Sequence, residues 1–268
     1  MAKPLVMILK EHGTNCENES KFAFEKAGAK ADIVHMNDWI CEPKRIHKYN
    51  IMMPPGGFSY GDDTGSAYGW SNRIKNNLKD EMLKFAEGNH LILGLCNGFQ
   101  LLVNFGLLPG LDGKYDEPKA ALMHNDRPRY KCRWVDLEIK SSSPWLKGID
   151  NLMVPIAHGE GKFFADEETL RLIKEKNLVA ARYSKGVICE YNGLPANPNG
   201  SLDDIAGVTD PSGRILGLMP HLERAIDFTQ MDNWTDVKRA CKDVGKELPS
   251  EGPGAQVLRN GVNYILEG

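Results

Sequence analysis

The stretch HLILGLCNGFQ, from His90 to Gln100, decides the fold. Its apolar start followed by Gly-x-Cys-x-Gly predicts a buried strand that ends in a tight turn, and the apolar residues that follow predict a helix packed back on the sheet. Gly94 and Gly98 flank Cys96, and small neighbours suit a nucleophile on a strained strand-to-helix turn. The N-terminus of a helix also favours a thiolate. The stretch therefore predicts that Cys96 is a nucleophile; the alternative is a buried cysteine that packs as a small apolar residue.

Strands and helices alternate around this stretch. Residues 4–9, 31–35 and 50–53 are predicted strands, and residues 20–27 and 67–87 are predicted helices. Strands that alternate with helices of this size indicate βαβ units. We therefore expect an α/β fold: a doubly wound, mostly parallel sheet with helices on both faces, of the flavodoxin-like kind.

The second half of the chain has a looser pattern. Its predicted strands cover residues 132–139, 153–157, 178–183, 187–191, 205–208 and 215–219, and its last predicted helix covers residues 255–266. Two polar segments, near residues 111–128 and 229–252, are predicted insertions, either contacts to a partner or plain surface loops. Because there is no repeat and no long linker, residues 1–268 are expected to form a single domain.

Composition excludes several classes of function. The chain has 268 residues and a formal net charge of -3, which gives no field to attract nucleic acid or an anionic membrane. No apolar run approaches the roughly 18 residues of a membrane span. The six cysteines include no CxxC pair or other metal-ligand spacing. We therefore expect free thiols, no metal site and a cytoplasmic protein.

A candidate base for Cys96 follows a later apolar strand, in the sequence MPHLER from Met219 to Arg224. His221 and Glu223 are two positions apart, so extended backbone puts both side chains on one face. A carboxylate there can hold one imidazole nitrogen while the other nitrogen faces the thiol. A histidine alone is more often a surface or core residue, but with the cysteine turn this pattern favours a triad of Cys96, His221 and Glu223.

A glycine-rich loop, PPGGFSYGD from Pro54 to Asp62, is a candidate oxyanion site. A tetrahedral intermediate on Cys96 needs N–H donors aimed at its oxygen, and glycines let a loop approach that closely. We expect one donor from Gly57 and the other from Asn97, directly after the nucleophile. The alternatives are a plain turn or a phosphate cradle, but the loop lacks the Gly-Lys-Ser/Thr ending of a P-loop.

Three motifs together carry a family resemblance: GLCNGFQ (residues 94–100), PGGFSYGD (55–62) and MPHLER (219–224). They resemble the triad-type (class I) glutamine amidotransferases. More narrowly, the chain is similar to the glutaminase subunits of phosphoribosylformylglycinamidine synthase, and three further stretches support this: GTNCE (13–17), AHGEGKF (157–163) and NPNGS (197–201). The matching stretches extend from the N-terminus to about residue 227.

The resemblance implies that Cys96 attacks the side-chain amide of glutamine, that His221 moves the proton and that Glu223 orients His221. It implies glutamine-binding roles for five positions: Gly57, Asn97, Gln100, Gly161 and Phe163. It also implies that ammonia passes to a large synthetase subunit, with a small third subunit in the complex. That synthetase would use ATP and Mg to convert formylglycinamide ribonucleotide, and this chain would need no cofactor.

Some features depart from the family pattern or add alternatives. Leu222 stands where the family usually has proline, which removes no functional group. Cys16 has no histidine nearby in sequence, so we expect it to shape a turn rather than act as a nucleophile. His12 and His158 lie in motif stretches and are expected near the pocket without a catalytic role. The main alternative function is a glutaminase for another biosynthetic synthetase; a cysteine peptidase and a non-catalytic binding module are the others.

Overall fold

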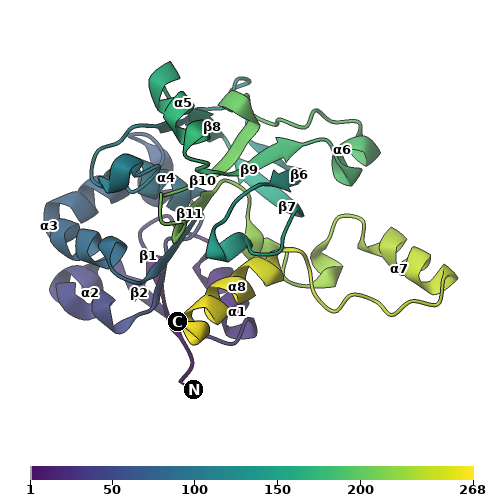
Figure 1. Cartoon of the computed structure of the whole chain (residues 1–268), viewed down its shortest axis with the longest axis horizontal. Helices are drawn as coiled ribbons and strands as arrows, with labels where there is room; N and C mark the ends of the chain where they lie inside the picture. Colours follow the sequence, from purple (N-terminus) through teal and green to yellow (C-terminus); the bar gives the residue numbers. More distant parts are fainter. Residues whose placement is uncertain (1) are drawn as a thin grey trace.

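The computed structural model describes residues 2–268, which form a central sheet covered by helices (Figure 1). The strands of this sheet are, in chain order, β1 (Leu5–Lys10), β2 (Lys30–His35), β3 (Ile51–Met53), β4 (Leu91–Leu95), β6 (Lys131–Ile139), β7 (Asn151–His158), β9 (Val179–Ser184), β10 (Ile205–Thr209) and β11 (Ile215–Leu218). Two further strands, β5 (Ala121–His124) and β8 (Glu160–Phe164), pair with each other.

The order of the nine strands is β2-β1-β3-β4-β11-β10-β9-β6-β7. The first five are parallel, and they include β4, which leads to Cys96, and β11, which leads to His221. The remaining four join antiparallel and extend the sheet. Because β4 and β11 are adjacent and parallel, their carboxyl ends lie at the same edge of the sheet. The predicted α/β class is confirmed, with a sheet that is mixed at one side.

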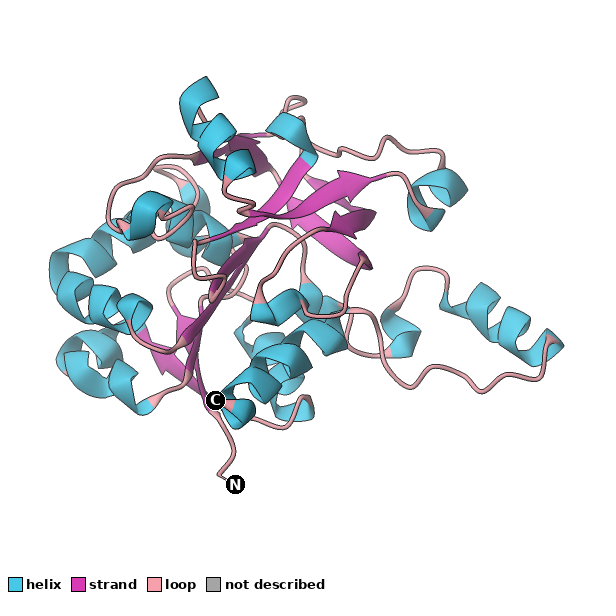
Figure 2. Ribbon diagram, viewed as in Figure 1, coloured by secondary structure: helices cyan, strands magenta, loops and turns pink. Residues whose placement is uncertain are grey.

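Helices cover both faces of the sheet (Figure 2). They are α1 (Glu17–Lys26), α2 (Met36–Cys41), α3 (Tyr68–Glu87), α4 (Asn97–Phe105), α5 (Glu167–Glu175), α6 (Val187–Asn192), α7 (Trp234–Asp243) and α8 (Gly254–Glu267). In β1, Val6 and Ile8 belong to a core shared with α1 and α8, while Met7 and Leu9 belong to a core shared with α2, α3 and α4. This alternation is what a strand buried on both faces requires.

One predicted strand is wrong: residues 187–191 form helix α6. The apolar, β-branched start of this segment favours a strand in isolation. In the fold, the Asp136 carboxylate accepts the backbone N–H groups of Ile188 and Cys189, at 3.3 and 2.9 Å. A carboxylate that satisfies the free N–H groups of a first turn stabilises a helix start, so a distant strand overrides the local preference.

The two segments predicted as insertions behave differently. Residues 111–128 contain a short 3₁₀ turn and β5, which pairs with β8. Residues 229–252 form an arm that carries α7 away from the body of the molecule (Figures 1 and 2), and no residue of α7 is buried. Within residues 2–268, none of the helices combines the length and apolar character that crossing a membrane requires.

Candidate active site

The strand, turn and helix predicted around Cys96 are present. β4 ends at Leu95 and α4 begins at Asn97, so Cys96 alone makes the turn, with φ 51° and ψ -107°. This conformation is strained for a residue with a side chain, and such strain persists only where the surroundings enforce it. Here the N–H of Cys96 donates to the Leu218 carbonyl of β11 at 2.8 Å. A Cβ at Gly98 would lie 1.8 Å from the Pro54 carbonyl oxygen, so only glycine fits there.

His221 and Glu223 form a buried pair after β11. Their Nδ1 and Oε1 atoms are 2.6 Å apart, and the side chains are 1% and 0% exposed. Burial lowers the pKa of His221, but Glu223 and the cysteines around it outweigh this and raise the pKa well above its ordinary value. Burial raises the pKa of Glu223, and the neighbouring imidazole lowers it overall. The pair is therefore suited to an imidazolium beside a carboxylate.

The second nitrogen of His221 is the one available for chemistry. Nδ1 is taken by Glu223, whereas Nε2 is buried and contacts no hydrogen-bond partner among the described residues. Cys96, 4% exposed, is among the groups that raise the pKa of His221, after Glu223. Because Nδ1 is occupied, we infer that Nε2 faces Cys96. A thiol, an imidazole and a carboxylate in this order can generate a thiolate nucleophile.

Cys16 also lies beside His221, and this contact could not be expected from its position in the sequence. Its Sγ is 4.0 Å from Nδ1 of His221, on the nitrogen already bound to Glu223. The three ligand atoms of Cys16, His221 and Glu223 lie within 4.8 Å of one another. Arg224 donates to the same sulfur through Nη2, at 2.9 Å. The Arg224 guanidinium is permanently charged, and its contact with the Cys16 sulfur disfavours a metal ion in this group. Because the sulfur faces the nitrogen of His221 that Glu223 already holds, Cys16 is the poorer partner for a base.

The predicted oxyanion loop is bonded through Asn97 to the strand-to-helix turn at Cys96, which we call the elbow. Its side-chain oxygen accepts the N–H of Ser59 at 3.1 Å, and its side-chain nitrogen donates to Gln100 at 3.0 Å. Gly57 has φ 152°, and a Cβ there would lie 2.5 Å from the Cα of Thr14. The loop is therefore held between the elbow and the segment after β1, with room at Gly57 for a glycine only.

The predicted glutamine-binding segment is strand β8, held from both sides. Gln100 donates to the Glu160 carbonyl at 2.7 Å, and Asn199 donates to the Gly161 carbonyl at 2.9 Å. Phe163 donates its N–H to the Ser201 hydroxyl, and its side chain is fully buried in the core. The NPNGS motif thus supports β8, and Phe163 presents no side-chain surface to a ligand.

Comparison with known proteins gives the family. The family described as "CobB/CobQ-like glutamine amidotransferase domain" matches residues 3–265. A protein of Methanococcus maripaludis (strain C7), named "Phosphoribosylformylglycinamidine synthase subunit PurQ", is 45% identical over 272 residues, covering 98% of this chain and 97% of the relative. The chain belongs to the PurQ family of glutamine amidotransferases. The resemblance read from the motifs is thereby confirmed, including the fold and the enzyme class.

More distant matches agree with this assignment. The protein of the same name from Dehalococcoides mccartyi is 38% identical to this amidotransferase, with all of both chains covered. A chain of the solved "Structure of PurLQS from Thermotoga maritima" superposes with a TM-score of 0.71 at 29% identity, covering 98% of this chain and 99% of that one.

His158 is a buried histidine of this amidotransferase close to the site, as its motif suggested. Its Nδ1 lies 3.2 Å from the Asn125 side-chain oxygen, while the Asn125 nitrogen donates to two backbone carbonyls. Nδ1 therefore carries the proton, and the buried Nε2 is unprotonated and has no hydrogen-bond partner among residues 2–268. Burial, and to a lesser extent His221, lower the pKa of His158 to about 3. The ring stays neutral and offers no competing acid beside His221.

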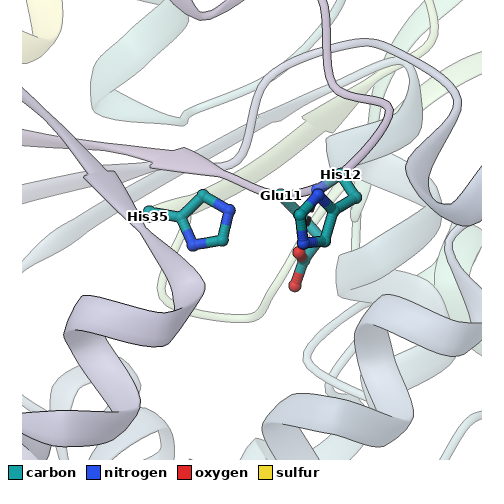
Figure 3. A group of neighbouring side chains, drawn as sticks. All are labelled: Glu11, His12 and His35. Carbon is teal, nitrogen blue, oxygen red and sulfur yellow. Dashed lines mark hydrogen bonds between the residues drawn. The ribbon is translucent and has the colours of Figure 1, made fainter.

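A second polar cluster lies where β1 and β2 end (Figure 3). Glu11 and His12 are side by side there, and His35 faces them from β2; their ligand atoms lie within 4.8 Å of one another. Glu11 accepts from Arg73 at 2.8 Å, and Nδ1 of His35 accepts the N–H of Asn37 at 3.1 Å. Arg73 thus pairs with the Glu11 carboxylate and the N–H of Asn37 takes one nitrogen of His35, and both contacts compete with a metal ion for this cluster.

Proposed function

We propose that Cys96 is the glutaminase nucleophile of this PurQ-family amidotransferase, that His221 is its base and acid, and that Glu223 orients His221. The observation that carries this is the buried pair of Glu223 with Nδ1 of His221, which leaves Nε2 free toward Cys96. A base held by a third group in this way is the arrangement that activates a thiol.

The reaction follows from these positions. Nε2 takes the thiol proton, and the Cys96 thiolate attacks the amide carbon of glutamine, which forms the C–S bond and an oxyanion. The N–H groups of Gly57 and Asn97 stabilise that oxyanion. When it collapses, the C–N bond breaks and His221 returns its proton to the leaving nitrogen, giving ammonia and a thioester. His221 then deprotonates water, which hydrolyses the thioester to glutamate and restores Cys96.

Ammonia then serves a partner. We assign to this chain the glutaminase role in phosphoribosylformylglycinamidine synthase, in purine biosynthesis, as its relatives are named. The partner would be a large synthetase subunit, with a small third subunit, that aminates formylglycinamide ribonucleotide using ATP and Mg. The solved complex called PurLQS supports a multi-subunit assembly. We place the chain in the cytoplasm, in keeping with its six free cysteines.

A glutamine analogue with a reactive electrophile tests the nucleophile. Diazo-oxo-norleucine should label Cys96 and none of the other five cysteines, as read by peptide mapping after labelling in the absence and presence of glutamine. In the complex, Cys96→Ala should abolish glutamine-dependent synthesis and leave ammonia-dependent synthesis intact. An adduct on Cys16, or loss of both activities, would contradict the proposal.

A further inference from the structure

Cys16 is a buried thiol that the glutaminase reaction does not use. It directly precedes α1 and is 0% exposed, yet its sulfur touches two residues of the active site. These contacts are Nη2 of Arg224 at 2.9 Å and Nδ1 of His221 at 4.0 Å. A side chain that merely fills space in the core needs neither of them.

The hydrogen-bond roles around this sulfur are determined by its partners. A guanidinium only donates, so the sulfur of Cys16 accepts from Arg224. The thiol proton has its own acceptor in the Asn15 side-chain oxygen, at 3.0 Å. The Cys16 thiol thus donates its proton to Asn15 and accepts a hydrogen bond from Arg224. The sulfur therefore fixes the position of the guanidinium.

Arg224 would not stay in place without such an anchor. Its side chain is 34% exposed, and its Nε is 4.0 Å from Oε1 of Glu223, which is a loose contact. A long, partly exposed side chain with one weak ion pair keeps much of its rotamer freedom. Although burial lowers the pKa of Arg224, its contacts with Cys16 and Glu223 raise it overall. Arg224 therefore holds a permanent positive charge beside the catalytic pair.

The Glu223 carboxylate opposes this charge, and the loop that carries Gly56 encloses the group. A Cβ at Gly56 would lie 3.2 Å from the Cys16 sulfur and 2.6 Å from Cε1 of His221, so the loop closes tightly over both. The groups whose charges act on His221 or Arg224 are Cys16, Cys96, Tyr130, His158 and Glu223. Of these, His158 is neutral, and burial raises the pKa of Tyr130, which keeps it neutral too.

We propose that Cys16 is a positioning residue: its sulfur fixes the Arg224 guanidinium beside the His221–Glu223 pair, and the charge sets the pH range in which Cys96 reacts. This inference rests on the proposed role of Cys96. A nearby cation stabilises the Cys96 thiolate and destabilises the His221 imidazolium. Thiolate protonation defines the acidic limb of the pH profile and imidazolium deprotonation the basic limb, so Arg224 moves both limbs to lower pH.

The test compares two substitutions that differ in whether they keep a hydrogen-bond acceptor at position 16. Serine at position 16 keeps an acceptor for Arg224, and valine does not. The pH dependence of Cys96 labelling by diazo-oxo-norleucine, and of kcat/KM for glutamine in the reconstituted complex, should be unchanged in Cys16→Ser. In Cys16→Val both limbs should move up by about half a pH unit. If Cys16→Val does not fold, Cys16→Ala takes its place.

Arg224 supplies the second arm of the experiment. Arg224→Gln should reproduce the upward shift, and adding Cys16→Val to it should shift the limbs no further, because the two changes remove one interaction. A Cys16→Val enzyme that is slower at every pH with unmoved limbs has a packing defect only and overturns the inference. Wild-type labelling away from Cys96 would instead refute the proposed function, so the two failures are distinguishable.

Discussion

Two connections in this molecule look alike in outline and differ in chemistry. β1 leads to α1 and β4 leads to α4, and in each case a cysteine is the residue directly before the helix. The first connection takes six residues, Glu11–Cys16, and Cys16 has an unstrained φ of -111°. The second takes one residue, and Cys96 has φ 51°. The Cys16 sulfur lies 4.0 Å from Nδ1 of His221, and under the proposed function the Cys96 sulfur faces Nε2 of the same ring.

The difference shows that position before a helix does not make a cysteine reactive. The Cys16 sulfur is bonded to Arg224 and Asn15, and the imidazole nitrogen nearest to it, Nδ1 of His221, is bonded to Glu223. Within residues 2–268, the Cys96 sulfur has only a long hydrogen-bond contact, 3.8 Å, to the Ala157 carbonyl. A nucleophile needs an acceptor for its proton and a sulfur free to attack. The one-residue turn leaves the Cys96 sulfur free of strong partners, and the proposed acceptor for its proton is Nε2 of His221.

Exchanging sulfur for oxygen in each connection should give the largest contrast. Cys96→Ser should lower glutamine-dependent kcat by about 10³-fold or more, because a hydroxyl is far less readily ionised than a thiol. Cys16→Ser should stay within about threefold of wild type, since serine can still accept from Arg224. Steady-state kinetics of the complex, with ammonium as the second nitrogen source, provide the measurement. Equal losses in the two variants would break the distinction.

The ion pair between Nδ1 of His221 and Glu223, on the side of the ring that faces Cys16, can be tested by the pH dependence of stability. Glu223 has a pKa below its ordinary 4.5, so its ionisation stabilises the fold above that pH and ceases to do so as the pH falls. His221 has a pKa above its ordinary 6.5, so its protonation stabilises the fold fully below that pH and less as the pH rises. Both contributions are present together between pH 4.5 and 6.5.

Glu223→Gln should therefore cost the most stability in that window, about 3 kcal/mol, as expected for breaking a buried ion pair. The cost should shrink on either side, as measured by urea unfolding from pH 4 to 9. Cys16→Ser serves as the control and should show no such window. A cost for Glu223→Gln that does not vary with pH would mean that the pair is not ionised in the folded state.

The smallest expected effect is in the backbone. Because Cys96 adopts a strained positive φ, Cys96→Gly should be more stable to urea than Cys96→Ala, by about 1 kcal/mol. At Cys16 the backbone is ordinary, so Cys16→Gly should be less stable than Cys16→Ala by about the same amount. The same sign at both positions would show that the elbow holds no strain.

The sequence is informative where the pattern is local. The cysteine turn was predictable because Gly94 and Gly98 frame Cys96 within five residues. A Cβ at Gly94 would clash with Gly98 across the turn, and a Cβ at Gly98 would clash with Pro54. His221 and Glu223 were predictable because two residues of extended chain put both on one face. In each case the residues that meet in space are neighbours in the chain.

The contact between Cys16 and His221 could not be predicted in the same way. The two residues are 205 positions apart, and they meet because β1 and β11 end at one edge of the sheet with β3 and β4 between them. The order of the strands in a sheet cannot be predicted from the spacing of apolar residues in the sequence. The same is true of α6, where the Asp136 carboxylate, about fifty residues upstream, holds the first turn.

The place of β11 has a consequence for protein synthesis. It is inserted between β4 and β10, yet it is the last strand of the sheet to leave the ribosome. A nascent chain that has emerged as far as α4 already contains Cys96, but it lacks both the strand that holds the Cys96 N–H and the residues from 221 to 224. Synthesis proceeds at about 5–20 residues per second, so several seconds separate the emergence of Cys96 from that of His221. Under the proposed mechanism, in which His221 is the base, unfinished chains therefore do not consume glutamine.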